Sequence, residues 1–250
     1  MSLHGTRDAA VGIVRTSALF PALAVAVAGC TTARADDPKE RFERDMMVRF
    51  HMHENLGLLR AVEKLLIRGR LAEATALARA IAVAPDEPGL GAYAPHAARV
   101  RELAAALGRA TTVDEGCRRV ARLGVACAGC HAETGVSPAL SDPPALPRDE
   151  PTVEARMARH VWATDRLWEA VIGGEDAPWK QGLEVLAAAP FPFRSSEDGR
   201  RAIGKQLQRV AISARAIDKL EDRGRAYGEL LGLCATCHTA SIATTLPSER

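Results

Sequence analysis

The sequence predicts an all-α protein built as two tandem four-helix-bundle modules. Alanine supplies much of the apolar content, which is 47% of the 250 residues, and alanine is the strongest helix former. No segment shows the alternation of apolar and polar residues that half-buried strands have. An internal repeat divides the chain into two halves, and each half carries four segments with helical signals.

The repeat rests on two anchors. A Cys-x-x-Cys-His motif at 127–131 recurs at 234–238, and in a second alignment further upstream His51 falls on His160. The two registers agree to within two residues, as expected for two copies of one module.

A proline-rich linker marks the boundary between the copies. Residues 136–151 contain five prolines, a composition that cannot continue a helix and is typical of a semi-rigid linker. We therefore predict one module at 38–135 and another at 152–240, with 241–250 as a tail.

The expected helices follow in order within each module. Pro/Gly segments at 85–95 and 190–192 interrupt the helical pattern, and Ser196 precedes acidic residues as an N-cap should. An i, i+4, i+7, i+11 apolar stripe begins at Ile203 and predicts the buried face of the seventh helix. The predicted helices are 38–68, 71–83, 96–109, 113–131, 152–172, 178–188, 196–216 and 217–238.

The N-terminus predicts export. A basic start is followed by an apolar run at 16–29 that is too short to span a membrane. Cys30 follows small residues as in a lipobox, where the cysteine is lipidated; the competing prediction is cleavage after Ala35. We assign 1–30 to the signal peptide or lipobox and 31–37 to a tether, which predicts a periplasmic protein with a possible lipid anchor to a membrane.

The charge pattern gives no sign of a nucleic-acid partner. The formal net charge is only +2 at pH 7, and we find no long run of one sign.

Covalent haem attachment is the chemistry that explains both motifs. Two thiols spaced by two residues suit the two porphyrin vinyl groups, and the adjacent histidine then supplies an iron ligand. The sequence therefore predicts two haem c groups with their iron, and haem would also add bulk to a core that has only 4% aromatic residues. The residues concerned are Cys127, Cys130 and His131 in the first module, and Cys234, Cys237 and His238 in the second.

Two other chemistries use paired cysteines, and neither explains the histidine. A thioredoxin-type motif lies near a βαβ pattern, which is missing here, and zinc ribbons place their two cysteine pairs much closer together. Cys117 has glycine as its counterpart in the repeat, so we interpret it as a small buried core residue.

Helical spacing selects His51 and His160 as candidate distal ligands of the iron. His51 shares a predicted apolar stripe with Met47, Leu58 and Val62, whereas His53 shares a charged one. His160 lies on an apolar stripe with Met157, Ala163, Leu167 and Val171. Met47, Met157 and His96 remain alternative ligands.

The arrangement resembles the cytochrome c prime group. That resemblance implies a four-helix bundle with Cys-x-x-Cys-His near the end of its last helix, and a first-helix residue facing the open side of the iron. The attachment residues of both motifs match the family pattern. The first helix departs from it, because histidine stands where the family has methionine or a non-coordinating apolar residue.

The expected function is electron transfer by an exported di-haem cytochrome that serves a redox partner protein and is not itself an enzyme. An alternative is a haem protein that binds NO, CO or peroxide at one open iron, with peroxidase-like activity as its catalytic form. A structural zinc protein is a third reading of the cysteine pairs.

Overall fold

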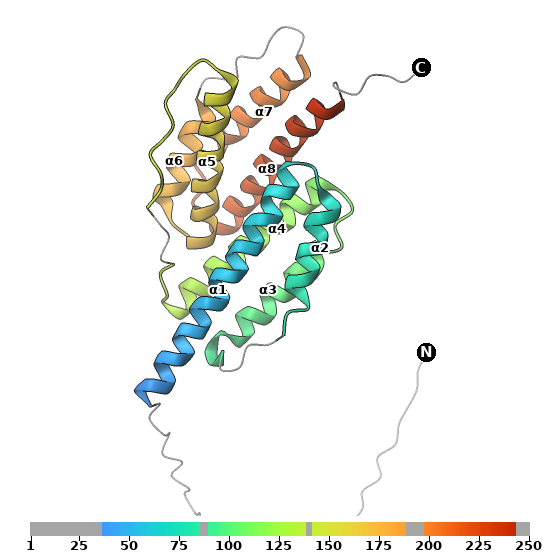
Figure 1. Ribbon diagram of the computed structural model, residues 1–250. Coiled ribbons are helices and arrows are strands. Elements are labelled where there is room, and N and C mark those ends of the chain that lie inside the picture. The colour runs from blue at the N-terminus through green and yellow to red at the C-terminus, as the bar shows by residue number, and fades with distance from the viewer. Residues whose placement is uncertain (1–36, 86–89, 139–141, 189–197, 244–250) are drawn as a thin grey trace, which may run out of the picture. The chain divides into compact units, whose positions relative to one another are not determined.

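The computed structural model describes residues 37–85, 90–138, 142–188 and 198–243. This part of the chain is all-α, with eight α-helices, one short 3₁₀ segment and no strand (Figure 1). The helices are α1 (Pro38–Ile67), α2 (Leu71–Ala82), η1 (Gly91–Tyr93), α3 (Ala94–Leu107), α4 (Val113–Thr134), α5 (Val153–Gly173), α6 (Asp176–Ala187), α7 (Asp198–Ala214) and α8 (Leu220–Ala243).

Local sequence explains where α4 and α5 begin and end. The Thr112 and Thr152 hydroxyls each accept a hydrogen bond from the backbone N–H three residues on, at 3.1 Å in both cases. Gly135 and Gly174 follow the two helices with φ of 68° and 72°, the left-handed conformation that favours glycine at a C-terminus.

Several helix boundaries differ from the prediction by a few residues. Helix α3 begins at Ala94, because Pro95 lies in the first turn, where a proline costs no hydrogen bond. Helix α8 continues to Ala243, beyond the predicted end at His238. The expected N-cap Ser196 lies outside the described residues.

Helices of each half pack in a closed cycle. Each helix contacts the next, and the first and fourth helices of each half, α1 with α4 and α5 with α8, contact each other. The halves are joined chiefly by α4 and α8, the most extensive helix pair of the fold. Buried residues from both halves form one continuous core, and the largest of them are Trp168, Trp179 and Tyr227.

Three glycines on α8 let it approach α4 closely. Gly224, Gly228 and Gly232 are four residues apart and so lie on one helix face. A Cβ on Gly228 would lie 2.9 Å from the Arg118 Cα, and one on Gly232 would lie 2.9 Å from an Asp114 carboxylate oxygen. The partner residue number on α4 falls as the glycine number rises, so the two helices are antiparallel.

The linker is fastened to α5. The Trp162 indole N–H donates to the Pro144 carbonyl at 2.7 Å, and Arg159 donates to the Pro147 carbonyl at 2.7 Å. Arg156 forms an ion pair with Asp149 at 2.7 Å. These contacts hold the described part of the linker along one side of the second half.

The predicted buried face of α1 is only partly correct: Val62 is fully buried, as predicted, but Met47 and Leu58 are not. Met47 is 45% exposed and Leu58 is 36% exposed, whereas Val48 and Leu59 are buried, one residue further along the chain in each case. Asn55 and Glu63 share the inward face, and their polarity concealed it in the sequence. On α5 the predicted stripe is confirmed, since Leu167 and its neighbours on that face are buried.

Candidate functional site

Both Cys-x-x-Cys-His motifs lie within helices. Helical spacing places the first cysteine, the second cysteine and the histidine on one face, because they are three and four residues apart. Each motif borders its own cavity, and none of the described cysteines is in a disulfide.

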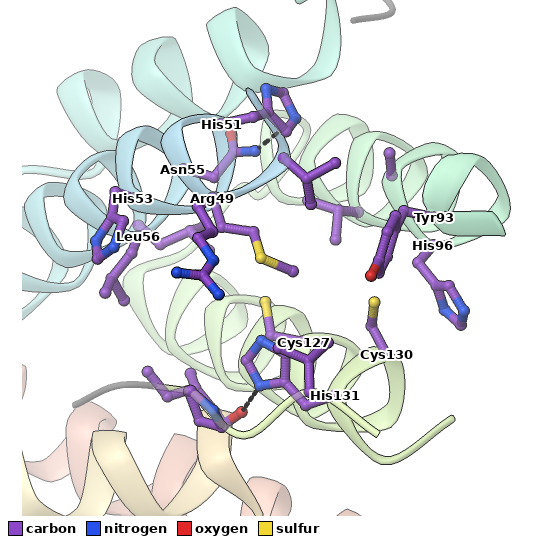
Figure 2. Close-up of a pocket in the computed structure, with 18 of the residues that line it drawn as sticks. Arg49, His51, His53, Asn55, Leu56, Tyr93, His96, Cys127, Cys130 and His131 are labelled. Carbon is purple, nitrogen blue, oxygen red and sulfur yellow. Dashed lines mark hydrogen bonds between the residues drawn. The ribbon is translucent and has the colours of Figure 1, made fainter. Parts of the chain in front are cut away.

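The first cavity lies between α1, α3 and α4 and measures about 330 Å³. Figure 2 shows the sulfur atoms of Cys127 and Cys130 directed into it from α4, with the His131 ring beside Cys127. His51 also lines this cavity, from α1 on the other side. The structure therefore brings the first attachment motif and its predicted distal histidine to one cavity.

His131 is held by a hydrogen bond that suits an iron ligand. Its Nδ1 lies 3.0 Å from the Ile172 carbonyl oxygen at the end of α5. A proton on Nδ1 leaves the Nε2 lone pair free for a metal, and such bonds fix the ring of ligating histidines. Burial lowers the pKa of the His131 ring, which favours the neutral, ligating form.

The second cavity lies between α1, α5, α7 and α8 and measures about 560 Å³. Its wall includes Cys234, Cys237 and His238 from α8 and His160 from α5. Burial, and to a smaller extent Arg68, lowers the pKa of His238. Burial also lowers the pKa of His160 to about 4, so this ring is neutral at physiological pH.

The alternative distal ligands differ in whether they line a cavity. Met157 lines the second cavity beside His160, so it stays a rival there. Met47 does not line the first cavity, and its exposure is 45%. Met52, which the sequence analysis missed, does line it; the correct inward face of α1 would have revealed this residue.

Other polar side chains on the first cavity distinguish it from the second. The His51 Nε2 lies 2.9 Å from the Asn55 amide nitrogen, a contact within α1. Figure 2 shows the Arg49 guanidinium extending from α1 toward Cys127 and His131, while the His51 ring lies further from the motif in this view. His96 also lines the cavity, and its Nε2 lies 3.7 Å from a Glu133 carboxylate oxygen.

The residues of both cavities fit a covalently attached haem. Each offers two thiols and a neutral histidine on one helix face, opposite further histidine or methionine side chains on a mostly apolar wall. Basic side chains on the walls suit the two carboxylates of a haem: Arg49 and Arg101 in the first cavity, and Lys64, Arg68 and Arg200 in the second.

Beside the second cavity lies a polar cluster, buried at Glu63 and Tyr227, that the sequence analysis did not foresee. The Tyr227 hydroxyl of α8 donates a hydrogen bond to the Glu63 carboxylate of α1. Arg60 pairs with Glu63 at 3.2 Å and with Asp165 at 3.0 Å, and its guanidinium lies 5.6 Å from the centre of the Trp168 ring. We call these five residues the Glu63 cluster.

Comparison with protein-family models, with curated proteins and with solved structures finds no match to this chain. Among the described helices, none has the length and apolar composition that crossing a membrane requires. Cys30 and the predicted signal lie outside the described residues, so the lipid anchor stays a prediction.

Proposed function

We propose that the chain is an exported di-haem c-type cytochrome that carries electrons for a redox partner protein in the periplasm. The observation that supports this most is that each cavity wall holds one Cys-x-x-Cys-His motif and one histidine of the matched pair. Neither the motif spacing alone nor the repeat alone requires that coincidence.

In this proposal each half is a four-helix haem module, as in the cytochrome c prime group. Cys127 and Cys130 hold one haem through thioether bonds, and Cys234 and Cys237 hold the other. His131 and His238 are the proximal ligands, and His51 and His160 the distal ones. Bound haem supplies a one-electron iron couple, and two histidine ligands keep its potential lower than a His/Met pair does.

The protein residues prepare the site for that couple. The Ile172 carbonyl fixes the tautomer and orientation of His131. Burial keeps His160 neutral, and the apolar wall around it limits access of water to the iron. Both features favour a ligand set that changes little between the two oxidation states, which is what electron transfer needs.

The test is expression of the full chain in a host that exports proteins and attaches haem. We expect two covalent haems per chain by mass, and two low-spin ferric signals by electron paramagnetic resonance (EPR). Loss of one haem in Cys127→Ala/Cys130→Ala and of the other in Cys234→Ala/Cys237→Ala would assign them. A colourless product from that host would contradict the proposal.

A second function is favoured by one feature of the first cavity. His51 is engaged by Asn55 within its own helix, and Arg49 extends toward the motif, so a small exogenous ligand such as CO, NO or peroxide could take the sixth position there. A high-spin ferric signal that disappears in Cys127→Ala/Cys130→Ala would support ligand binding at this site. Rapid CO binding without displacement of a protein ligand would support it further.

A further inference from the structure

The Glu63 cluster contains a carboxyl group that is almost completely buried. Glu63 is only 2% exposed, although carboxylates are almost never fully buried unless they are paired. Its partners are Tyr227 of α8, which donates a hydrogen bond to it, and Arg60 of its own helix. Arg60 also pairs with Asp165 of α5.

Glu63 also lies on the wall of the second cavity, together with Cys234, Cys237, His160 and His238. It is not on the wall of the first cavity, where Leu59, one turn earlier on α1, takes the corresponding place. A charge on Glu63 therefore acts mainly on a group bound in the second cavity, through a medium that screens charge poorly.

We propose that Glu63 takes up one proton when the second haem site takes up one electron. The inference rests on the proposed function. The electron comes from the redox partner or, in a titration, from a chemical reductant; the proton comes from solvent. Ferric iron becomes ferrous, the Glu63 carboxylate becomes a carboxylic acid, and only an O–H bond forms.

The charges around Glu63 leave it able to exchange this proton. Burial raises the pKa of the carboxyl, and this effect outweighs the opposing effects of Arg60 and of the Tyr227 hydrogen bond. Asp165 acts in the same direction as burial. The Cys117 thiol also interacts electrostatically with Glu63, but it is uncharged, because burial raises its pKa to about 12. In the haem-loaded protein Cys234 would be a thioether, which carries no charge.

Arg60 cannot replace Glu63 as the titrating group, because a guanidinium keeps its proton throughout the accessible pH range. Tyr227 cannot either, since burial and the adjacent Glu63 raise its pKa well above the ordinary value. Asp165 also lines the second cavity, but its side chain is 45% exposed, so solvent screens its charge. Glu63 is the buried carboxyl of the cluster, and its charge therefore acts most strongly on a group bound in that cavity.

The experiment is a redox titration of the haem-loaded protein between pH 5 and 9. Cys127→Ala/Cys130→Ala leaves the second haem alone, which assigns its midpoint. We expect that midpoint to fall as pH rises, by up to about 59 mV per pH unit, the value for one proton and one electron. In Glu63→Gln the slope should flatten, with the midpoint near that of the protonated wild type. An unchanged slope in this variant would overturn the proposal.

Two further variants keep the inference testable if Glu63→Gln does not fold. Tyr227→Phe removes a hydrogen bond that stabilises the carboxylate, so the pH range over which the midpoint falls should move to higher pH. If that range stays where it is in the wild type, Glu63 is not the titrating group. The matched control is Glu169→Gln, since Glu169 is partly buried and pairs with Arg166, as Glu63 pairs with Arg60, but lies on neither cavity wall. Its slope should equal that of the wild type, and a flattened slope would overturn the assignment.

The two proposals fail separately. Absence of covalent haem by mass would contradict the proposed function. Haem present with a midpoint at the second site that does not vary with pH would contradict only the role of Glu63.

Discussion

Cys117 lies outside both Cys-x-x-Cys-His motifs, so its thiol should stay free when the motif cysteines are bound to haem. It is fully buried in the core, as the sequence analysis predicted for a small apolar position. Burial raises the pKa of its thiol to about 12, so at pH 8 only roughly one chain in ten thousand carries the reactive thiolate.

This gives a thiol count that tests haem attachment. In Cys30→Ser protein from a haem-attaching host, a thiol reagent at pH 8 should find no reactive thiol in the folded chain and one after denaturation. The same chain made without haem attachment should show five after denaturation. Five thiols in protein from the haem-attaching host would exclude thioether bonds at both motifs.

His160 is the proposed distal ligand whose assignment is easiest to test from the structure. It lines the second cavity and is neutral, whereas its rival Met157 lies three residues earlier on α5 and lines the same cavity. We expect His160→Ala to convert the second haem from low-spin to high-spin in the ferric EPR spectrum, because the sixth ligand is lost. Met157→Leu is the matched control and should leave the spectrum low-spin; the reverse pattern would assign the methionine.

At the scale of single elements, the α4–α8 contact depends on the absence of a side chain at Gly228. A Cβ there would meet the Arg118 Cα at 2.9 Å and the Cys117 carbonyl oxygen at 3.3 Å, and backbone atoms cannot rotate away. We expect Gly228→Ala to lower the free energy of unfolding by about 1–3 kcal/mol, as overpacking does. Chemical denaturation measures this.

Gly57 provides the control for that substitution. It lies in the interior of α1, and nothing lies within 4 Å of the position a Cβ would take. Alanine is the better helix former, so Gly57→Ala should raise the free energy of unfolding by about 0.5–1 kcal/mol. Equal destabilisation by the two substitutions would show that helix propensity, and not the close approach of α8, decides the outcome.

The start of α6 carries an ion pair with a predictable pH dependence. Arg223 of α8 is buried, and it donates to the Asp176 carboxylate and to the Ile217 carbonyl at 3.1 Å. The hydrogen bond and charge of Arg223 lower the pKa of Asp176 below its ordinary value. The native state therefore holds this proton less tightly than the unfolded chain does, so the stabilisation is complete above about pH 4 and is lost as pH falls through the lowered pKa.

Asp176→Ala should accordingly lower the thermal midpoint at pH 7, and the difference from the wild type should shrink as the pH is lowered below about 4. Thermal denaturation at several pH values measures both effects. A difference that grows on acidification would contradict the assigned sign.

The number and order of the described helices could be predicted from the sequence. Which face of each helix is buried, and which helices pack together, was predicted less well. The periodic segments and the proline interruptions placed all eight helices within a few residues. The face of α1 was partly mistaken because Asn55 and Glu63 point inward, and a buried polar residue disguises apolar periodicity. The pairing of α4 with α8 was missed, although three glycines at a spacing of four on α8 are visible in the sequence.

The sequence predicted the motif residues and the matched histidines of the candidate sites, but not the other residues of the cavity walls. Motif chemistry selected the candidate attachment residues, and the repeat selected His51 and His160; the structure places one motif and one of these histidines on the wall of each cavity. Met52, Arg49 and Glu63 lay beyond sequence reasoning, because each reaches its cavity only through the way α1 is rotated against α4 and α8.

At the scale of the whole molecule, the antiparallel pairing of α4 and α8 sets the two attachment motifs apart. Gly228 lies beside Arg118, and from that level Cys130 is twelve residues along α4, while Cys237 is nine residues along α8 in the opposite direction. At 1.5 Å per residue these two cysteines are about 30 Å apart along the helix axes. Both α1 and α5 contribute to the two walls: Leu59 and Glu63 lie one turn apart on α1, and Ile172 and Asp165 lie on α5.

Two haems held at these motifs would be separated by protein and should behave as magnetically distinct centres. We expect the ferric EPR spectrum of the loaded chain to equal the sum of the spectra of Cys127→Ala/Cys130→Ala and Cys234→Ala/Cys237→Ala. Protein side chains of the Glu63 cluster border the second cavity here, with the Trp168 and Tyr227 rings buried and 6.0 Å apart. Exchange-broadened or split signals in the loaded chain, absent from both variants, would require the motifs to lie side by side and would contradict the antiparallel arrangement of α4 and α8.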